Sequence, residues 1–96
     1  MIIVTATITA KPDERDNIIL KSQNLIESTR LESGCISYNL YKSTENDDIL
    51  LMHEQWENLE ALETHMQTEH FKAFGVAIED ILARKLDIAV YSADKI

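Results

Sequence analysis

Apolar residues recur with the period of a β-strand in some segments of the chain and with that of an α-helix in others. The order of these segments restricts the fold more than any other feature of the sequence. Residues 2–10 alternate between two faces with the period of two that a β-strand requires, and residues 86–91 do so again. Segments 35–42 and 49–56 are rich in strand-forming residues, and the short polar loop 43–48 between them predicts an antiparallel hairpin. The sequence therefore predicts four strands.

Helical patterns occupy the two long intervals between these strands. Lys11, Pro12 and Asp13 end the first strand and are expected to begin a helix, because proline is accepted in a first helical turn. This helix is predicted to run to about Ser33, where Gly34 supplies a left-handed stop. In the second interval, Asn58 is expected to cap a helix that breaks near Gln67-Thr68, with Thr68 capping the next segment.

The resulting order, βαββαβ, is typical of an α+β, ferredoxin-like domain with a four-stranded antiparallel sheet and helices on one face. Ninety-six residues suffice for one such domain, spanning 1–96, although its core is small. The other face of the sheet, which carries side chains such as Thr5 and Thr7, must meet water or a second sheet. A homodimer is therefore expected.

Charge and cysteine content exclude several classes of partner. Seventeen Asp and Glu against nine scattered Lys and Arg give a net charge of −8, which argues against nucleic acid and against an anionic membrane surface. No apolar run is long enough to span a bilayer, and the first residues lack the pattern of a signal peptide. The one cysteine, Cys35, is interpreted as a small apolar filler, and the protein is expected to be cytoplasmic.

Functional side chains are densest between Met52 and Phe74. Met52, Glu54 and Trp56 share one face of a strand, and His65 lies on the same helical face as Leu62, so that it is predicted to point toward the sheet. A carboxylate, an indole and an imidazole should therefore converge in an apolar pocket. The remaining predicted pocket residues are Met66, His70, Phe71 and Phe74.

Each of these residues also has a purely structural interpretation. Trp56 can be a core anchor. His65 can be a hydrogen-bonded core histidine, but the functional side chains around it make a functional role equally favoured. An unpaired buried carboxylate is costly, so Glu54 is harder to explain by packing alone. His70 could help cap a helix start, and His53 alternates away from Glu54 and is left out of the site.

Other chemistries find little support in the sequence. His65 and His70 are five residues apart, about 140° around a continuous helix, whereas helical zinc sites use a spacing of four, so no metal site is predicted. The only glycines are Gly34 and Gly75, which excludes glycine-rich phosphate loops and a nucleophile on a glycine-flanked turn.

One stretch of sequence resembles a known family. Its residues are Glu54-Gln55-Trp56-Glu57, Leu62-Glu63, His65, Gln67-Thr68, His70 and Lys72-Ala73, and the similarity extends to Gly34-Cys35 and Tyr38. This pattern is similar to the signature of the antibiotic biosynthesis monooxygenase family, particularly its small bacterial quinol monooxygenases.

The resemblance implies a dimeric α+β barrel in which two sheets close face to face, with a pocket in each subunit between sheet and helices. It also implies oxidation of a small aromatic substrate, phenolic or quinol, by molecular oxygen without flavin, haem or metal. By position, Trp56 matches the family's pocket tryptophan, and His65 and His70 match its paired histidines. We expect His65 to be the base, with Glu54 as a second candidate. Met52 and Leu62 replace an asparagine and a tyrosine of antibiotic-pathway members, so those substrate contacts do not transfer.

Relatives with other activities provide the alternatives. Haem degradation is disfavoured because the first strand lacks an asparagine and no tryptophan follows Trp56. An isomerase of a phosphorylated quorum signal stays open, but Lys72 is the only basic residue between positions 52 and 74 and is expected to face solvent. The other alternative is a non-catalytic ligand-binding or stress-response dimer.

Overall fold

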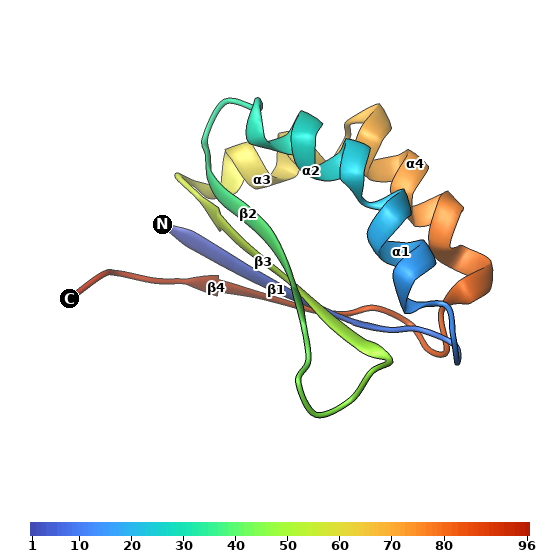
Figure 1. Ribbon diagram of the computed structural model, residues 1–96. Helices are drawn as coiled ribbons and strands as arrows, with labels where there is room; N and C mark the ends of the chain where they lie inside the picture. Colours follow the sequence, from blue (N-terminus) through green and yellow to red (C-terminus); the bar gives the residue numbers. More distant parts are fainter.

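The computed structural model describes residues 1–96 as one sheet covered on one face by helices (Figure 1). The elements follow one another in the predicted order, and the second helical interval is divided near Thr68 as predicted, but the first interval also holds two helices. The elements are β1 (Ile2–Thr9), α1 (Arg15–Lys21), α2 (Gln23–Arg30), β2 (Cys35–Lys42), β3 (Ile49–Trp56), α3 (Leu59–Met66), α4 (Glu69–Ile78), the 3-10 helix η1 (Glu79–Ile81) and β4 (Asp87–Ser92).

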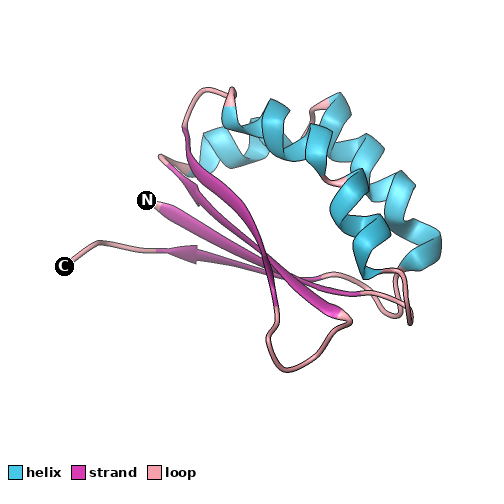
Figure 2. Ribbon diagram, viewed as in Figure 1, coloured by secondary structure: helices cyan, strands magenta, loops and turns pink.

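The sheet is antiparallel throughout, in the order β2-β3-β1-β4. The central pair aligns Val4 with Glu54 and Ala6 with Met52, and β2 aligns Tyr38 with Glu54. The ferredoxin-like prediction is confirmed. All helices lie on the same side of the sheet (Figure 2), so that the side chains of Val4, Ala6, Met52, Glu54 and Tyr38 are buried beneath them.

The first helical interval differs from the prediction at its start and in its middle. Asp13 has a φ of 68°, in the left-handed region, so the chain turns there and α1 begins at Arg15. Ser22 then separates α1 from α2, and its hydroxyl donates to the carbonyl of Ile19 at 2.7 Å. Such local bonds from serine compete with the helical ladder. Gly34, with a φ of 85°, ends the turn after α2, in the conformation predicted for it.

The two predicted caps of the second interval are confirmed. The Asn58 side chain accepts from the amide of Ala61 at 2.9 Å, and Thr68 accepts from the amide of Phe71 at 3.3 Å. Because Thr68 has extended backbone angles, it separates α3 from α4 and changes the direction of the chain. None of the helices has the length and apolar character needed to cross a membrane.

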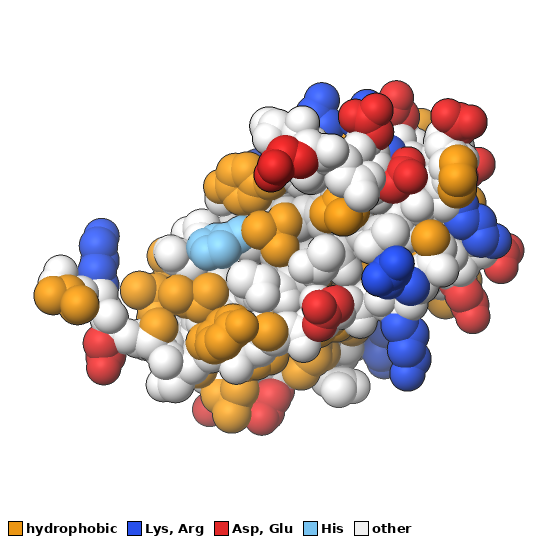
Figure 3. Space-filling model, turned by 90° about the horizontal axis from the view of Figure 1, so that it is seen from below, with side chains coloured by type: hydrophobic (Ala, Val, Ile, Leu, Met, Phe, Trp, Pro, Cys, Tyr) orange, Lys and Arg blue, Asp and Glu red, His pale blue; other side chains and the backbone are white.

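The face of the sheet opposite the helices has no covering layer. Thr5 and Thr7 of β1 are only partly buried, and Tyr41 and Tyr91 on the outer strands are 52% and 54% exposed. Figure 3 shows this side of the molecule, with hydrophobic side chains gathered over one half and charged side chains concentrated toward the other end. A second sheet would find an apolar surface here.

Candidate active site

An apolar cavity of about 80 Å³ lies between the sheet and helices α2, α3 and α4. Val4, Ala6 and Ile8 of β1 form its floor, and Glu54 and His65 are the only acidic or imidazole side chains among its fifteen lining residues. Six of the eight residues predicted for the site line this cavity: Met52, Glu54, His65, Met66, Phe71 and Phe74.

The cavity is open on the side of strand β4. Its lining residues Ile88 and Val90 are 52% and 50% exposed, and Met66 at the end of α3 is 39% exposed, whereas the other walls are largely buried. The enclosed volume is about half of the roughly 150 Å³ in which an apolar protein cavity holds benzene. An aromatic ligand would therefore extend from the enclosed part into this opening.

Trp56 lies behind the cavity wall and not on its surface. It is fully buried at the end of β3, and its indole Nε1 donates to Oε1 of Glu54 at 3.0 Å. The pKa of Glu54 is raised to about 7, chiefly by burial; the hydrogen bond from Trp56 lowers it in part, and the charge of Glu32 adds a smaller increase. Glu54 therefore exchanges its proton near neutral pH, which suits an acid or a base of catalysis.

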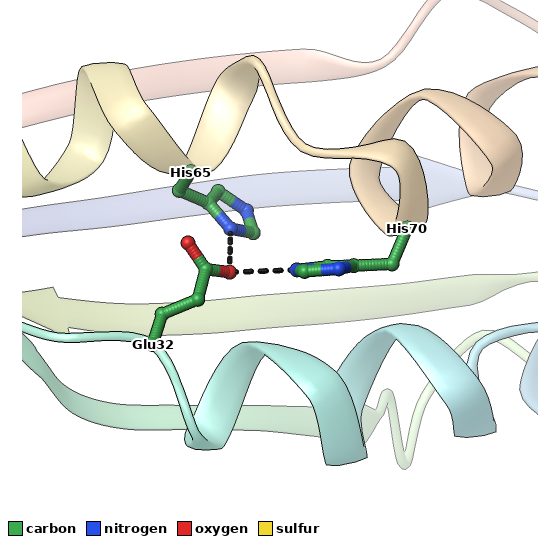
Figure 4. A group of neighbouring side chains, drawn as sticks. All are labelled: Glu32, His65 and His70. Carbon is green, nitrogen blue, oxygen red and sulfur yellow. Dashed lines mark hydrogen bonds and ion pairs between the residues drawn. The ribbon is translucent and has the colours of Figure 1, made fainter.

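Three side chains from separate elements meet beside the cavity (Figure 4). Glu32, in the turn after α2, places Oε2 at 2.7 Å from Nδ1 of His65 and 2.8 Å from Nε2 of His70. His65 comes from the last turn of α3 and His70 from the first turn of α4. Because a carboxylate oxygen only accepts hydrogen bonds, both nitrogens donate to it. Glu32 was not predicted for the site, and His70 contacts Glu32 and does not line the cavity.

Burial favours the neutral form of His65, and one nitrogen of its ring has no hydrogen-bond partner. Burial lowers its pKa, the hydrogen bond and the charge of Glu32 raise it, and nearby His70 lowers it. The ring is 1% exposed and packs against Trp56, Phe71 and Tyr38, at centroid distances of 4.8, 5.1 and 5.4 Å. Its Nε2 is buried without a hydrogen-bond partner. With the proton on Nδ1, this nitrogen presents a lone pair that can accept a proton from a ligand.

The cluster of Glu32, His65 and His70 also has the composition of a metal site. Its three ligand atoms lie within 4.8 Å of one another, although five residues separate the histidines, because the break at Thr68 removes the continuous helix on which the 140° estimate rested. Both nitrogens, however, converge on Oε2 at hydrogen-bond distances. Two ligands held about 2.0 to 2.1 Å from one tetrahedral ion lie more than about 3 Å apart. At the shorter separations seen here the cluster is a hydrogen-bond network, and a metal ion would require the carboxylate to move.

The predicted directions of the His53 and Lys72 side chains are confirmed, whereas the capping role considered for His70 is not found. His53 pairs in register with Thr5 and Asn39 and faces away from Glu54. Lys72 is exposed, and no lysine or arginine lines the cavity. His70 does not cap α4, because the hydroxyl of Thr68 does so.

Comparisons with known proteins agree with this architecture. The family model described as antibiotic biosynthesis monooxygenase matches residues 1–76. An uncharacterized Synechocystis protein, sll1783, is 40% identical over 94% of this chain, which spans 61% of that relative's length. The probable quinol monooxygenase YgiN of Escherichia coli is 29% identical, with 92% of this chain and 95% of that protein covered. A crystal structure of a conserved Methanosarcina mazei protein superimposes with a TM-score of 0.92 at 32% identity, covering 97% of this chain and 92% of the other.

Proposed function

The chain belongs to the antibiotic biosynthesis monooxygenase family, and on this premise we propose that it oxidises a quinol or another phenolic small molecule with molecular oxygen, without flavin, haem or metal. One observation carries the proposal: the unpartnered Nε2 of His65 belongs to a residue on the wall of a cavity that is hydrophobic apart from His65 and Glu54. A phenolic ring fits such a wall, and its hydroxyl would be the missing partner of His65. The name of the YgiN relative supports the quinol class.

The proposed reaction converts a hydroquinone and one O₂ into a hydroxyquinone and one water. His65 removes a hydroxyl proton, and the resulting anion passes one electron to O₂. The two radicals join through a bond between a ring carbon and oxygen, and a proton completes the hydroperoxide. The O–O bond then breaks, the carbon loses its proton, and water departs. The substrate loses four electrons, and O₂ is reduced by the same four.

The protein contributes a base and a water-poor enclosure. General-base catalysis by a positioned histidine accelerates proton removal by roughly 10² to 10⁴-fold. Phe71 and Phe74 shield the inner part of the cavity from water, whereas Met66 borders its opening. Glu54, with a pKa near 7, can donate a hydrogen bond to a second substrate oxygen in its protonated form.

Oxygen uptake by purified protein with a panel of quinols and polyphenols tests this function. The variant His65→Gln should lower kcat by about 10² or more, whereas Glu63→Gln, an exposed change on the same helix α3, should leave kcat unchanged. Burial lowers the pKa of His65 from its ordinary value of 6.5. The midpoint of the acid limb of the pH–rate profile should therefore lie below pH 6.5. Uptake no greater than that of buffer with every substrate would reject the monooxygenase and favour a binding protein.

The isomerase of a phosphorylated substrate has less support. A phosphate needs arginine, lysine or backbone donors, and neither basic residue lines the cavity. We further propose that the protein works as a homodimer in the cytoplasm. The uncovered, partly apolar sheet face supports the dimer, and the single free Cys35 suits a reducing compartment.

A further inference from the structure

The cluster of His65, Glu32 and His70 extends from the cavity wall toward the surface, and the exposure of its side chains increases in that order. The side chains of His65, Glu32 and His70 are 1%, 13% and 19% exposed, respectively. Only His65 belongs to the cavity, so neither Glu32 nor His70 can touch a ligand there without rearrangement. Any effect of these two residues on the reaction must therefore pass through His65.

We propose that Glu32 is the positioning residue that selects the reactive tautomer of His65, with His70 as the anchor that holds the Glu32 carboxylate in place. The effect of Glu32 on catalysis, as part of this inference, rests on the proposed function. The structural part of the inference, the tautomer, stands independently of any substrate.

The tautomer decides whether His65 can act as a base. A neutral imidazole carries one proton, and the nitrogen that holds it is set by the partner of the other nitrogen. Nδ1 lies 2.7 Å from an oxygen that can only accept, so the proton belongs on Nδ1 and the lone pair on Nε2. Without the carboxylate, Nε2 could carry the proton and would then donate to a substrate hydroxyl, which is the wrong direction for proton removal.

The carboxylate itself needs an anchor because of where it sits. Glu32 belongs to the turn between α2 and β2, where its amide donates to the carbonyl of Thr29 and its carbonyl accepts from the amide of Cys35. These bonds hold the backbone but not the long side chain, and His70 supplies a second donor to Oε2 at 2.8 Å. The other ionisable groups that influence this region are Cys35 and Tyr38 of β2 and Glu54 of β3. None of these groups hydrogen-bonds to His65, so Glu32 alone sets its tautomer.

Nitrogen-15 NMR of the imidazole rings tests the structural part without any substrate. In the unmodified protein at pH 8, the couplings of His65 should show a protonated Nδ1 and an unprotonated Nε2. Glu32→Gln should shift the proton of His65 wholly or partly to Nε2, whereas Glu27→Gln, an exposed change on α2, should not. A protonated Nε2 in the unmodified protein would overturn the inference even if the Glu32 variant failed to fold.

Kinetics with an accepted quinol test the catalytic part. Glu32→Gln should lower kcat at least about tenfold with KM nearly unchanged, because removing the carboxylate partner of a catalytic histidine costs up to about 10⁴-fold. His70→Ala should give a smaller loss of the same kind, and Glu32→Asp should retain more activity than Glu32→Gln. Unchanged kcat in Glu32→Gln would refute the positioning role. If no quinol is oxidised at all, the proposed function fails, while the NMR result still decides the tautomer.

Discussion

The indole of Trp56 donates a hydrogen bond to the carboxyl group of Glu54 at 3.0 Å, and both side chains are buried. The two residues share one face of β3, and Glu54 is in register with Val4 on one neighbouring strand and Tyr38 on the other. The carboxyl group therefore has one hydrogen-bond partner and largely apolar surroundings, which explains why burial is the main cause of its pKa of about 7.

Replacement of Glu54 by glutamine should stabilise the protein in a pH-dependent manner. The folded pKa, about 7, lies above the unfolded value of 4.5, so the folded state holds the proton more tightly and stability falls as the pH rises from 4.5 to 7. Glutamine stays neutral and can still accept from Trp56. Relative to the unmodified protein, Glu54→Gln should gain roughly 2 to 3 kcal/mol more at pH 8 than at pH 5. Urea unfolding at both pH values measures this gain. If the variant and the unmodified protein differed by the same free energy at pH 5 and at pH 8, the prediction would be wrong.

The strand pattern was predictable because a period of two is a local signal that the sheet preserves. Val4, Ala6 and Ile8 are buried under the helices and Thr5 lies on the open face, as the alternation predicts. The direction of His65 was predictable for the same reason, because it shares a helical face with the buried Leu62.

Glu32 could not be predicted because its role depends on contacts across the chain. It lies 33 residues before His65 and 38 before His70, and no local pattern distinguishes it from the exposed acids around it. The only sequence signal is indirect: an inward-facing histidine on an apolar face needs an acceptor. The start of α1 was also misplaced, because Pro12 permits a helix start whereas the left-handed Asp13 prevents one.

Gly34 should tolerate no side chain. Its φ of 85° is unfavourable for other residues, and a Cβ atom would lie 2.6 Å from the Cβ of Ala61, closer than such contacts occur. Gly34→Ala should therefore lower the free energy of unfolding by about 2 kcal/mol or more. It should also disturb the turn that carries Glu32.

Gly75 provides the matched control for this substitution. It lies within α4, and a Cβ there meets no atom within 4 Å. Gly75→Ala should raise the free energy of unfolding by roughly 0.5 to 1 kcal/mol. Urea denaturation of both variants measures the two changes in the free energy of unfolding, which should have opposite signs. If Gly34→Ala were stabilising, the turn would differ from the one described.

The uncovered sheet face should make the protein dimeric at micromolar concentration. A specific dimer buries roughly 1,200 to 2,000 Å² in total, and the exposed Tyr41 and Tyr91 lie on this face. Sedimentation equilibrium should give about twice the chain mass of 11.0 kDa. Thr5→Lys and Thr7→Lys together would place charges at the centre of the face and should shift the equilibrium toward the monomer. A monomeric unmodified protein would exclude the barrel.

Trp56 fluorescence should distinguish the quinol monooxygenase from the isomerase without any turnover. It is the only tryptophan, and it contacts both polar groups of the cavity: Nε1 bonds Glu54, and the ring lies 4.8 Å from that of His65. A quinone in the cavity should quench it saturably, beyond the collisional quenching of free N-acetyltryptophanamide. Inorganic phosphate should have no effect, because no lysine or arginine lines the cavity. Phe74→Asp, which adds a charge to the wall, should abolish the quinone response if the ligand lies there. A saturable response to phosphate with none to the quinone would reverse the preference and support a phosphorylated substrate.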